Sequence, residues 1–140
     1  MRRILGLDVG TVRVGVALSD PLGIAAQPFE VIDRRVVEPF GRVAEIVKEN
    51  GVERIIVGRP LRLSGEAGPA AAMVDVFVSA LAEKVDVPIE LWDERMSTAQ
   101  AERAMIEGGA RRETRRKNID KVAAALILQS YLDATGHTEE

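Results

Sequence analysis

Three acidic residues directly follow apolar segments that have the composition of buried strands. Asp8 ends the run ILGLD, and Asp93 and Glu94 follow the segment VPIELW. A carboxylate without a partner is costly to bury, so an acid at the end of a core strand needs a physical reason. In open α/β sheets, the carboxyl ends of parallel strands meet at the edge where ligands bind. If these two strands are neighbours, Asp8 approaches Asp93 or Glu94 at one edge of the sheet.

A fourth acid, Asp120, lies in the segment NIDKVAAALILQSYLDA. At about 100° per residue it shares a helical face with Ala124, Ile127 and Tyr131, the face expected to pack on the sheet. An acid in the first turn of a helix is also stabilised by the helix dipole, which is a purely structural alternative. Converging carboxylates repel one another unless a cation intervenes, and oxygen ligands suit a hard divalent cation such as Mg²⁺ or Mn²⁺. Asp8, Asp120 and one of Asp93 and Glu94 therefore indicate a metal site held by three carboxylates.

The charges are unevenly distributed along the 140 residues. The net charge is −3, which by itself argues weakly against a nucleic-acid partner. Residues 95–121 nevertheless carry eight Lys or Arg and four Asp or Glu, a balance of +4, against eleven and eighteen elsewhere, a balance of −7. A basic region of this kind can face a polyanion, although a run such as RRETRRK is also typical of a solvated helix face.

The composition excludes several classes of protein and site. The chain has no cysteine, so disulfides and thiolate metal sites are impossible. No apolar stretch approaches the ~18 residues of a membrane span, and the N-terminus lacks a signal-peptide cleavage site, so we expect a cytoplasmic protein without a membrane partner. The length predicts one domain. We place it at residues 1–136, followed by a polar tail at 137–140 that holds the single histidine.

Hydrophobic periodicity predicts a mixed α/β domain. Strands are expected at 3–8, 13–19, 24–32, 54–58 and 87–92, with Pro28 favouring an edge or a bulge in the third of them. Helices are expected at 39–50, 69–84, 97–107 and 119–134, where Pro39, Gly51 and a Ser97–Gln100 capping box give start and stop signals. Three antiparallel strands followed by alternating helix and strand imply a mixed five-stranded sheet with helices on both faces.

Four segments together identify a family. The stretches LDVGTVRVGVALSD, IIVGRPLRLSGEAGP, WDERMSTAQAE and IDKVAAALILQSYLD resemble, in order and spacing, the YqgF family. These are small RNase H-like proteins described as Holliday junction resolvases and as pre-16S rRNA nucleases. The resemblance covers about residues 3–134. It implies an RNase H-like fold, metal-dependent phosphodiester hydrolysis, and Asp8, Glu94 and Asp120 as catalytic residues and metal ligands, which favours Glu94 over Asp93.

The resemblance also suggests how a nucleic acid would be bound. Two Mg²⁺ or Mn²⁺ ions held by the three carboxylates would activate a water and stabilise the leaving oxygen. The glycines of the 64–68 loop would let it close over the substrate, which is branched DNA or precursor rRNA, and a junction-cutting enzyme would favour a homodimer. Val12, Arg59 and Arg62 depart from the family pattern and concern substrate preference. The expected substrate-binding residues are Gly10, Thr11, Arg13, Arg95, Arg111, Arg112, Arg115 and Arg116.

Two other functions are compatible with parts of the sequence. The stretch DVGTVRVGVALSD also resembles the first phosphate loop of actin-like ATPases and sugar kinases, whose backbone N–H groups bind phosphate. Those proteins clamp nucleotide between two such domains, and this chain has the length of one. A non-catalytic nucleic-acid-binding or ribosome-binding module with the same fold is the second alternative.

Overall fold

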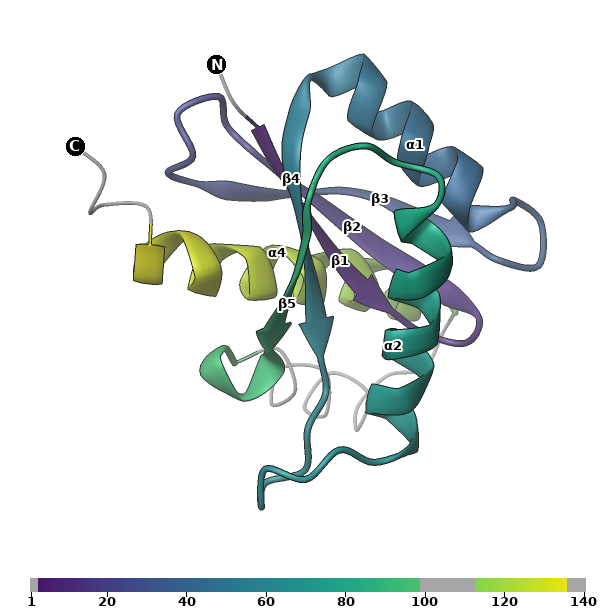
Figure 1. The fold of residues 1–140 in the computed structure, drawn as a ribbon, viewed down its shortest axis with the longest axis vertical. Helices are drawn as coiled ribbons and strands as arrows, with labels where there is room; N and C mark the ends of the chain where they lie inside the picture. Colours follow the sequence, from purple (N-terminus) through teal and green to yellow (C-terminus); the bar gives the residue numbers. More distant parts are fainter. Residues whose placement is uncertain (1–2, 99–112, 136–140) are drawn as a thin grey trace.

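The computed structural model describes residues 3–98 and 113–135, and for residues 113–118 it describes the backbone alone. Its centre is a five-stranded sheet in the order β3-β2-β1-β4-β5 (Figure 1). The first three strands are antiparallel, whereas β4 and β5 run parallel to β1. This mixed sheet confirms the predicted fold class. The strands are β1 (Arg3–Val9), β2 (Arg13–Ser19), β3 (Ala26–Asp33), β4 (Val52–Arg59) and β5 (Ile89–Asp93).

Helices cover both faces of the sheet, as Figure 1 shows. Helix α1 (Pro39–Asn50) begins at a proline behind the capping carboxylate of Glu38 and ends at Gly51, whose positive φ closes the last turn. Helix α2 (Pro69–Ala82) lies on the same face as α1, and helix α4 (Glu113–Thr135) crosses the opposite face. A single 3₁₀ turn, η1 (Glu94–Met96), follows β5 directly.

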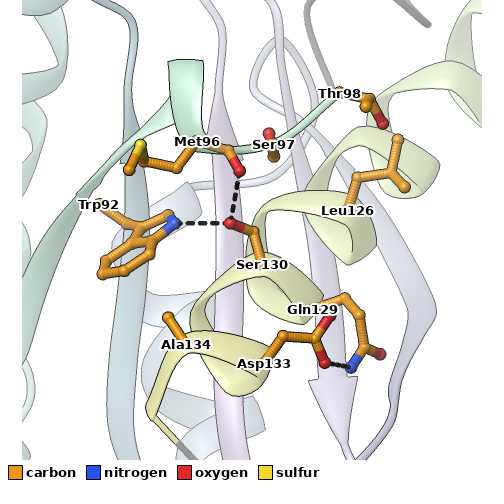
Figure 2. A pocket seen from close by; sticks show the side chains of 9 residues that line it. All are labelled: Trp92, Met96, Ser97, Thr98, Leu126, Gln129, Ser130, Asp133 and Ala134. Atoms are coloured by element: carbon orange, nitrogen blue, oxygen red, sulfur yellow. Dashed lines mark hydrogen bonds between the residues drawn. The ribbon is translucent and has the colours of Figure 1, made fainter.

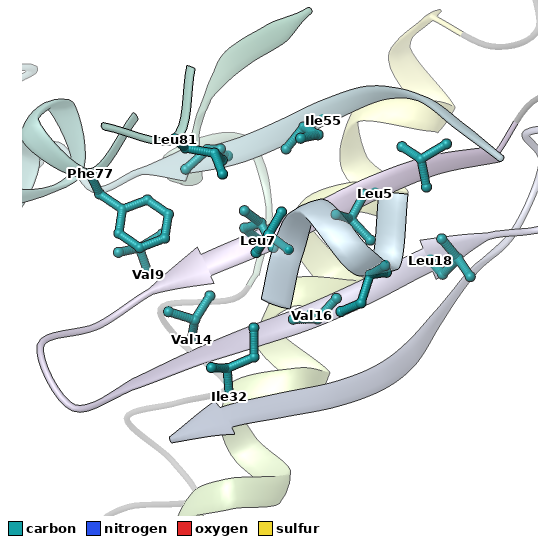
Figure 3. Close-up of a cluster of buried hydrophobic side chains, with 14 of the residues drawn as sticks. Leu5, Leu7, Val9, Val14, Val16, Leu18, Ile32, Ile55, Phe77 and Leu81 are labelled. Atoms are coloured by element: carbon teal, nitrogen blue, oxygen red, sulfur yellow. The ribbon is translucent and has the colours of Figure 1, made fainter. Parts of the chain in front are cut away.

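Two hydrophobic cores follow from the alternation of side chains along the strands. On β1, Leu5, Leu7 and Val9 face α1 and α2, where they join the larger core (Figure 3). The intervening positions face α4, and the smaller core on that side is built by Ile56 together with apolar residues of α4 such as Ile127. Any residue of β1 between these apolar positions therefore points toward α4.

Helix α4 packs very closely against the sheet, and glycines make this possible. A Cβ added at Gly6 would lie 2.8 Å from the Cβ of Leu128, and one added at Gly58 would lie 2.6 Å from Cδ1 of Ile127. A Cβ at Gly15 would overlap the backbone carbonyl of Asp120. The sheet thus presents bare backbone to the helix on three adjacent strands.

Most element boundaries lie within one or two residues of the predicted ones, and the outcomes at β3 and α4 are the most informative. Strand β3 runs over Ala26–Asp33 and is an edge strand of the sheet. Its register with β2 shifts between Val16 and Ala17, next to Pro28. The edge position and the bulge expected from Pro28 are therefore both found. Helix α4 begins at Glu113, six residues before the expected start, so Asp120 is not in its first turn. The helix expected at 97–107 lies almost wholly outside the described residues.

No helix in the described part of the chain is both long enough and apolar enough to cross a membrane.

Candidate active site

Asp8 lies near the carboxyl end of β1 and on the face that α4 covers. Its neighbours Leu7 and Val9 belong to the core on the other face, so alternation directs Asp8 toward α4. The residue is only 8% exposed. Across the antiparallel pairing it stands opposite Gly15 of β2. The predicted strand-end acid is therefore buried at the edge of the sheet where the parallel strands end.

Glu94, the first residue of η1, lies beside Asp8. It is 2% exposed. A Cβ built at Gly58 would lie 2.9 Å from Oε2 of Glu94 and 3.0 Å from its Cγ, so the side chain occupies the space above that glycine. Gly58 follows Val57, the partner of Leu7 in the β1–β4 pairing. Asp8 therefore lies on β1, and the carboxylate of Glu94 lies over the adjacent strand β4, on the same face of the sheet.

Asp93, the alternative to Glu94, is committed to a different role. Its side chain accepts a hydrogen bond from the backbone N–H of Arg95 at 2.9 Å and forms an ion pair with the Arg95 guanidinium at 2.7 Å. This hydrogen bonding to Arg95 lowers the pKa of Asp93 below its ordinary value. The structure thus turns Asp93 toward Arg95 and Glu94 toward α4.

The depressed pKa of Asp93 makes the stability of the fold depend on pH. A carboxyl whose pKa is lower in the folded chain stabilises it above the unfolded pKa of about 3.9, and this contribution is lost as pH falls through the folded value. We therefore expect Asp93→Asn to lose less stability than the wild type between pH 6 and pH 3, since asparagine still caps the turn. Urea unfolding at both pH values measures this. Equal losses in the two proteins would show that the Asp93–Arg95 pair does not contribute.

Asp120 comes to the same edge from α4, but its carboxylate is held by Arg13. Its backbone carbonyl lies against Gly15, the partner of Asp8. Its Oδ2 accepts a hydrogen bond from Nε of Arg13 at 2.8 Å, and the two side chains are 21% and 15% exposed. Arg13, predicted to bind substrate, therefore contacts one of the three predicted metal ligands.

The donor set fits a hard cation in its chemistry but is not assembled. Asp8 and Glu94 offer carboxylate oxygens, the ligands that Mg²⁺ and Mn²⁺ prefer. Within residues 3–98 and 113–135, however, no three His, Cys, Asp or Glu side chains gather closely enough to hold a metal ion. The structure thus brings all three acids to one edge and one face, with Asp120 directed to Arg13.

The turn between β1 and β2 borders this edge and is firmly braced. Gly10 donates its N–H to the carbonyl of Arg13 at 2.9 Å, while Thr11 is exposed at the tip. Arg34 donates from its guanidinium to the Gly10 carbonyl and from its backbone to the Val12 carbonyl, each at 2.8 Å. Gly10 and Thr11 thus lie in the turn at the end of β1 that carries Asp8. The role of Arg34 was not predicted, because only the folded hairpin brings it to the turn.

A second loop, between β4 and α2, reaches the same edge. An isolated bridge between Leu61 and Ala67 closes it, and Gly65 has a φ of 95° at its tip. Arg95 donates a hydrogen bond to the Leu63 carbonyl at 3.3 Å. Arg95, expected at the substrate, therefore also tethers this loop to η1.

Arg59 of β4, which departs from the family pattern, forms a partly exposed ion pair with α2. Its guanidinium donates to both carboxylate oxygens of Asp75 on α2, at 2.9 and 2.8 Å. This hydrogen bonding lowers the pKa of Asp75. Arg59 thus links the sheet to α2 beside the loop.

The predicted basic surface stays a prediction. Arg111 and Arg112 lie outside the described residues, and Arg115 and Arg116 belong to α4 but their side chains are not described.

A pocket of about 490 Å³ lies on the outer side of η1, against α4 (Figure 2). Trp92 donates its indole N–H to Oγ of Ser130 at 3.0 Å, and that hydroxyl donates in turn to the Met96 carbonyl at 2.9 Å. These bonds attach the end of β5 and η1 to α4, and they thereby help to hold Glu94, the first residue of η1, in place. The lining residues are Trp92, Met96, Ser97, Thr98, Leu126, Gln129, Ser130, Asp133 and Ala134.

The sequence and the fold match known proteins along almost the whole chain. Residues 2–134 match the family model RuvX, described as Holliday junction resolvase. A protein of Desulforamulus reducens named "Putative pre-16S rRNA nuclease" is 50% identical over 133 residues, which cover 94% of this chain and 97% of that protein. A protein of the same name from Symbiobacterium thermophilum is 51% identical over 133 residues, covering 94% and 92%.

A solved structure shares the fold. The RuvC protein of T. thermophilus in complex with a Holliday junction substrate superimposes with a TM-score of 0.58 at 20% identity, covering 97% of this chain and 98% of that one. At this identity the likeness concerns the arrangement of strands and helices.

Proposed function

The chain belongs to the RuvX (YqgF) family, whose description is Holliday junction resolvase, and from this premise we propose that it is a metal-dependent endonuclease acting on structured nucleic acid. The observation that carries the proposal is the pair of buried carboxylates at the carboxyl ends of the parallel strands, Asp8 on β1 and Glu94 over Gly58 of the adjacent β4. Carboxylate oxygens at one place are the ligands that a hard divalent cation prefers.

In this proposal Asp8, Glu94 and Asp120 would hold the cations. Such ions, when bound, would supply activation of a water and stabilisation of the leaving oxygen. The chain contributes the positions of its own groups. The Trp92–Ser130–Met96 hydrogen bonds support η1 behind Glu94, and Arg34 fixes the turn at Gly10 and Thr11 that would border the scissile phosphate.

Precursor rRNA is the substrate we favour, because the names of the relatives at about half identity refer to pre-16S rRNA. The family description favours a four-way DNA junction as the second candidate. A labelled junction and a labelled RNA hairpin with a 5′ extension, offered together with Mn²⁺, measure the preference directly. We expect the RNA to be cleaved before the junction. Cleavage of the junction alone would contradict the proposed preference for RNA.

The proposal also concerns assembly, cofactor and location. Cutting two strands of a junction favours a twofold dimer, whereas trimming an RNA end does not require one. Sedimentation of the chain with each substrate separates these cases. We propose Mg²⁺ or Mn²⁺ as the cofactor and the cytoplasm as the compartment. If neither nucleic acid is cut but one is bound, the chain is the non-catalytic module, and heat on titration with ATP would instead support a nucleotide-binding domain.

Substitution of Gly65 by proline tests the β4–α2 loop. Gly65 has a φ that proline cannot adopt, and its N–H donates to the Arg62 carbonyl at 2.7 Å. We expect Gly65→Pro to lower the cleavage rate by about tenfold to a hundredfold through a misplaced loop, without changing Mn²⁺ affinity.

Gly23→Pro is the matched control for this loop variant. Gly23 also has a positive φ and also donates its N–H within a turn, to Asp20 at 3.0 Å, but that turn joins β2 to β3 at the opposite edge of the sheet. Single-turnover cleavage and Mn²⁺ titration compare the two variants. Equal rates for Gly65→Pro and Gly23→Pro would exclude a role for the loop.

A further inference from the structure

The ion pair between Arg13 and Asp120 joins residues that are 107 positions apart. Both side chains are mostly buried, at 15% and 21% exposure, and Nε of Arg13 lies 2.8 Å from Oδ2 of Asp120. The pair stands at the strand end where Asp8 and Glu94 lie. The guanidinium of Arg13 is therefore bound to Asp120, one of the three carboxylates that the proposed function assigns to the metal.

The backbones on both sides of this ion pair are fixed. The Arg13 carbonyl accepts the N–H of Gly10, and Arg34 braces the same turn through the Gly10 carbonyl. On the other side, the backbone of Asp120 lies against Gly15 without room for a Cβ. A change of partner at this point thus requires only rotation of two side chains.

A guanidinium and a divalent cation meet the same electrostatic need at this edge. Each neutralises carboxylates that would otherwise repel one another. Asp120 cannot give its Oδ2 to both at once, and the described residues contain no assembled group of three ligands. Arg13 is also suited to a second partner, since a guanidinium binds the oxygens of a phosphate in the same forked geometry with which it binds those of a carboxylate.

From these contacts we propose that Arg13 exchanges partners: it holds Asp120 while the metal is absent, and it turns to a phosphate oxygen of the nucleic acid once Asp120 joins the metal. The inference rests on the proposed function and deepens it. Binding of the metal by Asp120 frees Arg13 for the phosphate, and binding of the phosphate by Arg13 frees Asp120 for the metal. Metal and nucleic acid therefore strengthen each other's binding. Arg13 is in this sense a positioning residue that couples the two ligands.

Calorimetric titration with Mn²⁺ alone tests the first half of the exchange. Arg13→Gln removes the competing cation, so we expect it to bind Mn²⁺ about twofold to fivefold more tightly than the wild type, the range that an ion pair of this kind contributes. The effect must vanish in an Asp120→Asn background, because the competition acts through that carboxylate. Arg35→Gln is the matched control, since Arg35 pairs with Asp33 at 2.9 Å on a carboxylate outside the site.

Binding of a labelled 5′-extended RNA hairpin tests the second half, with Ca²⁺ in place of Mn²⁺ to leave the RNA uncleaved. Ca²⁺ should strengthen binding to the wild type more than to Arg13→Gln. Unchanged or weaker Mn²⁺ affinity in Arg13→Gln, while the wild type still binds Mn²⁺ and cuts, would overturn the exchange but keep the proposed function. Absence of both Mn²⁺ binding and cleavage in the wild type would overturn the two together.

Discussion

Asp8→Asn is expected to reduce cleavage by about 10³-fold or more, because the loss of one metal carboxylate removes several kcal/mol of transition-state stabilisation. Asparagine keeps almost the same shape and removes the charge. The residue is 8% exposed and stands next to the buried Glu94, so its charge has little water to screen it. Rate measurements with Mn²⁺, together with Mn²⁺ titration, determine the effect.

The stability of the same variant separates a metal ligand from a structural acid. Without metal, neutralising Asp8 relieves repulsion from Glu94 and Asp120, so the melting temperature should equal or exceed that of the wild type. Loss of a structural hydrogen bond would lower stability by about 1–3 kcal/mol. Asp86→Asn, at an exposed position away from the site, is the matched control. A variant that melts lower and still cuts would assign Asp8 to the fold and remove the central residue of the proposed function.

Gly15→Ala is expected to destabilise the fold by about 3 kcal/mol or more, at the upper end of the cost of overpacking. The added Cβ would meet the backbone carbonyl of Asp120, and neither the centre of a sheet nor a long helix yields easily. Urea unfolding measures the loss, which should include displacement of α4 and hence of Asp120.

Gly41→Ala is the control for that substitution. Among the described residues, and apart from its chain neighbours and its own helix backbone, its Cβ would approach Oε1 of Glu38, at 2.9 Å, a side-chain oxygen that also accepts the N–H of Gly41. We expect a loss far smaller than for Gly15→Ala, because a side-chain oxygen shifts more easily than a backbone carbonyl and alanine is favoured over glycine in a helix. Similar unfolding midpoints for the two variants would mean that α4 adjusts readily and that the glycines of the sheet do not fix its position.

The sequence predicted the sheet well because its signals are local. Alternation, the proline at position 28 and the glycine at position 51 each fix a conformation through a few neighbouring residues, and the structure confirms all three. The meeting of Asp8 and Glu94 was expected only if their two strands were neighbours, and they are not: β4 lies between β1 and β5, and the side chain of Glu94 lies over Gly58 of β4 instead. Which of Asp93 and Glu94 faces α4 did not follow, because η1 interrupts the alternation at that point.

The contacts that complete the site depend on tertiary packing, which no local pattern encodes. Arg13 reaches Asp120, and Trp92 reaches Ser130, across 107 and 38 residues of sequence. Arg34 carries no motif and becomes relevant only when β3 pairs with β2. The start of α4 at Glu113 was not predicted, because the segment before residue 119 has no apolar stripe that would indicate a helix.

A ring contact between β5 and α4 gives the protein an intrinsic fluorescent reporter. Trp92 and Tyr131 are its single tryptophan and its single tyrosine, and their rings meet edge to face at a centroid distance of 5.3 Å. Nearly all near-ultraviolet absorption and emission of the chain therefore arises from one pair of rings that spans β5 and α4. Any displacement of the strand that leads to Glu94 relative to the helix that carries Asp120 changes the emission of this pair, without a label and without turnover.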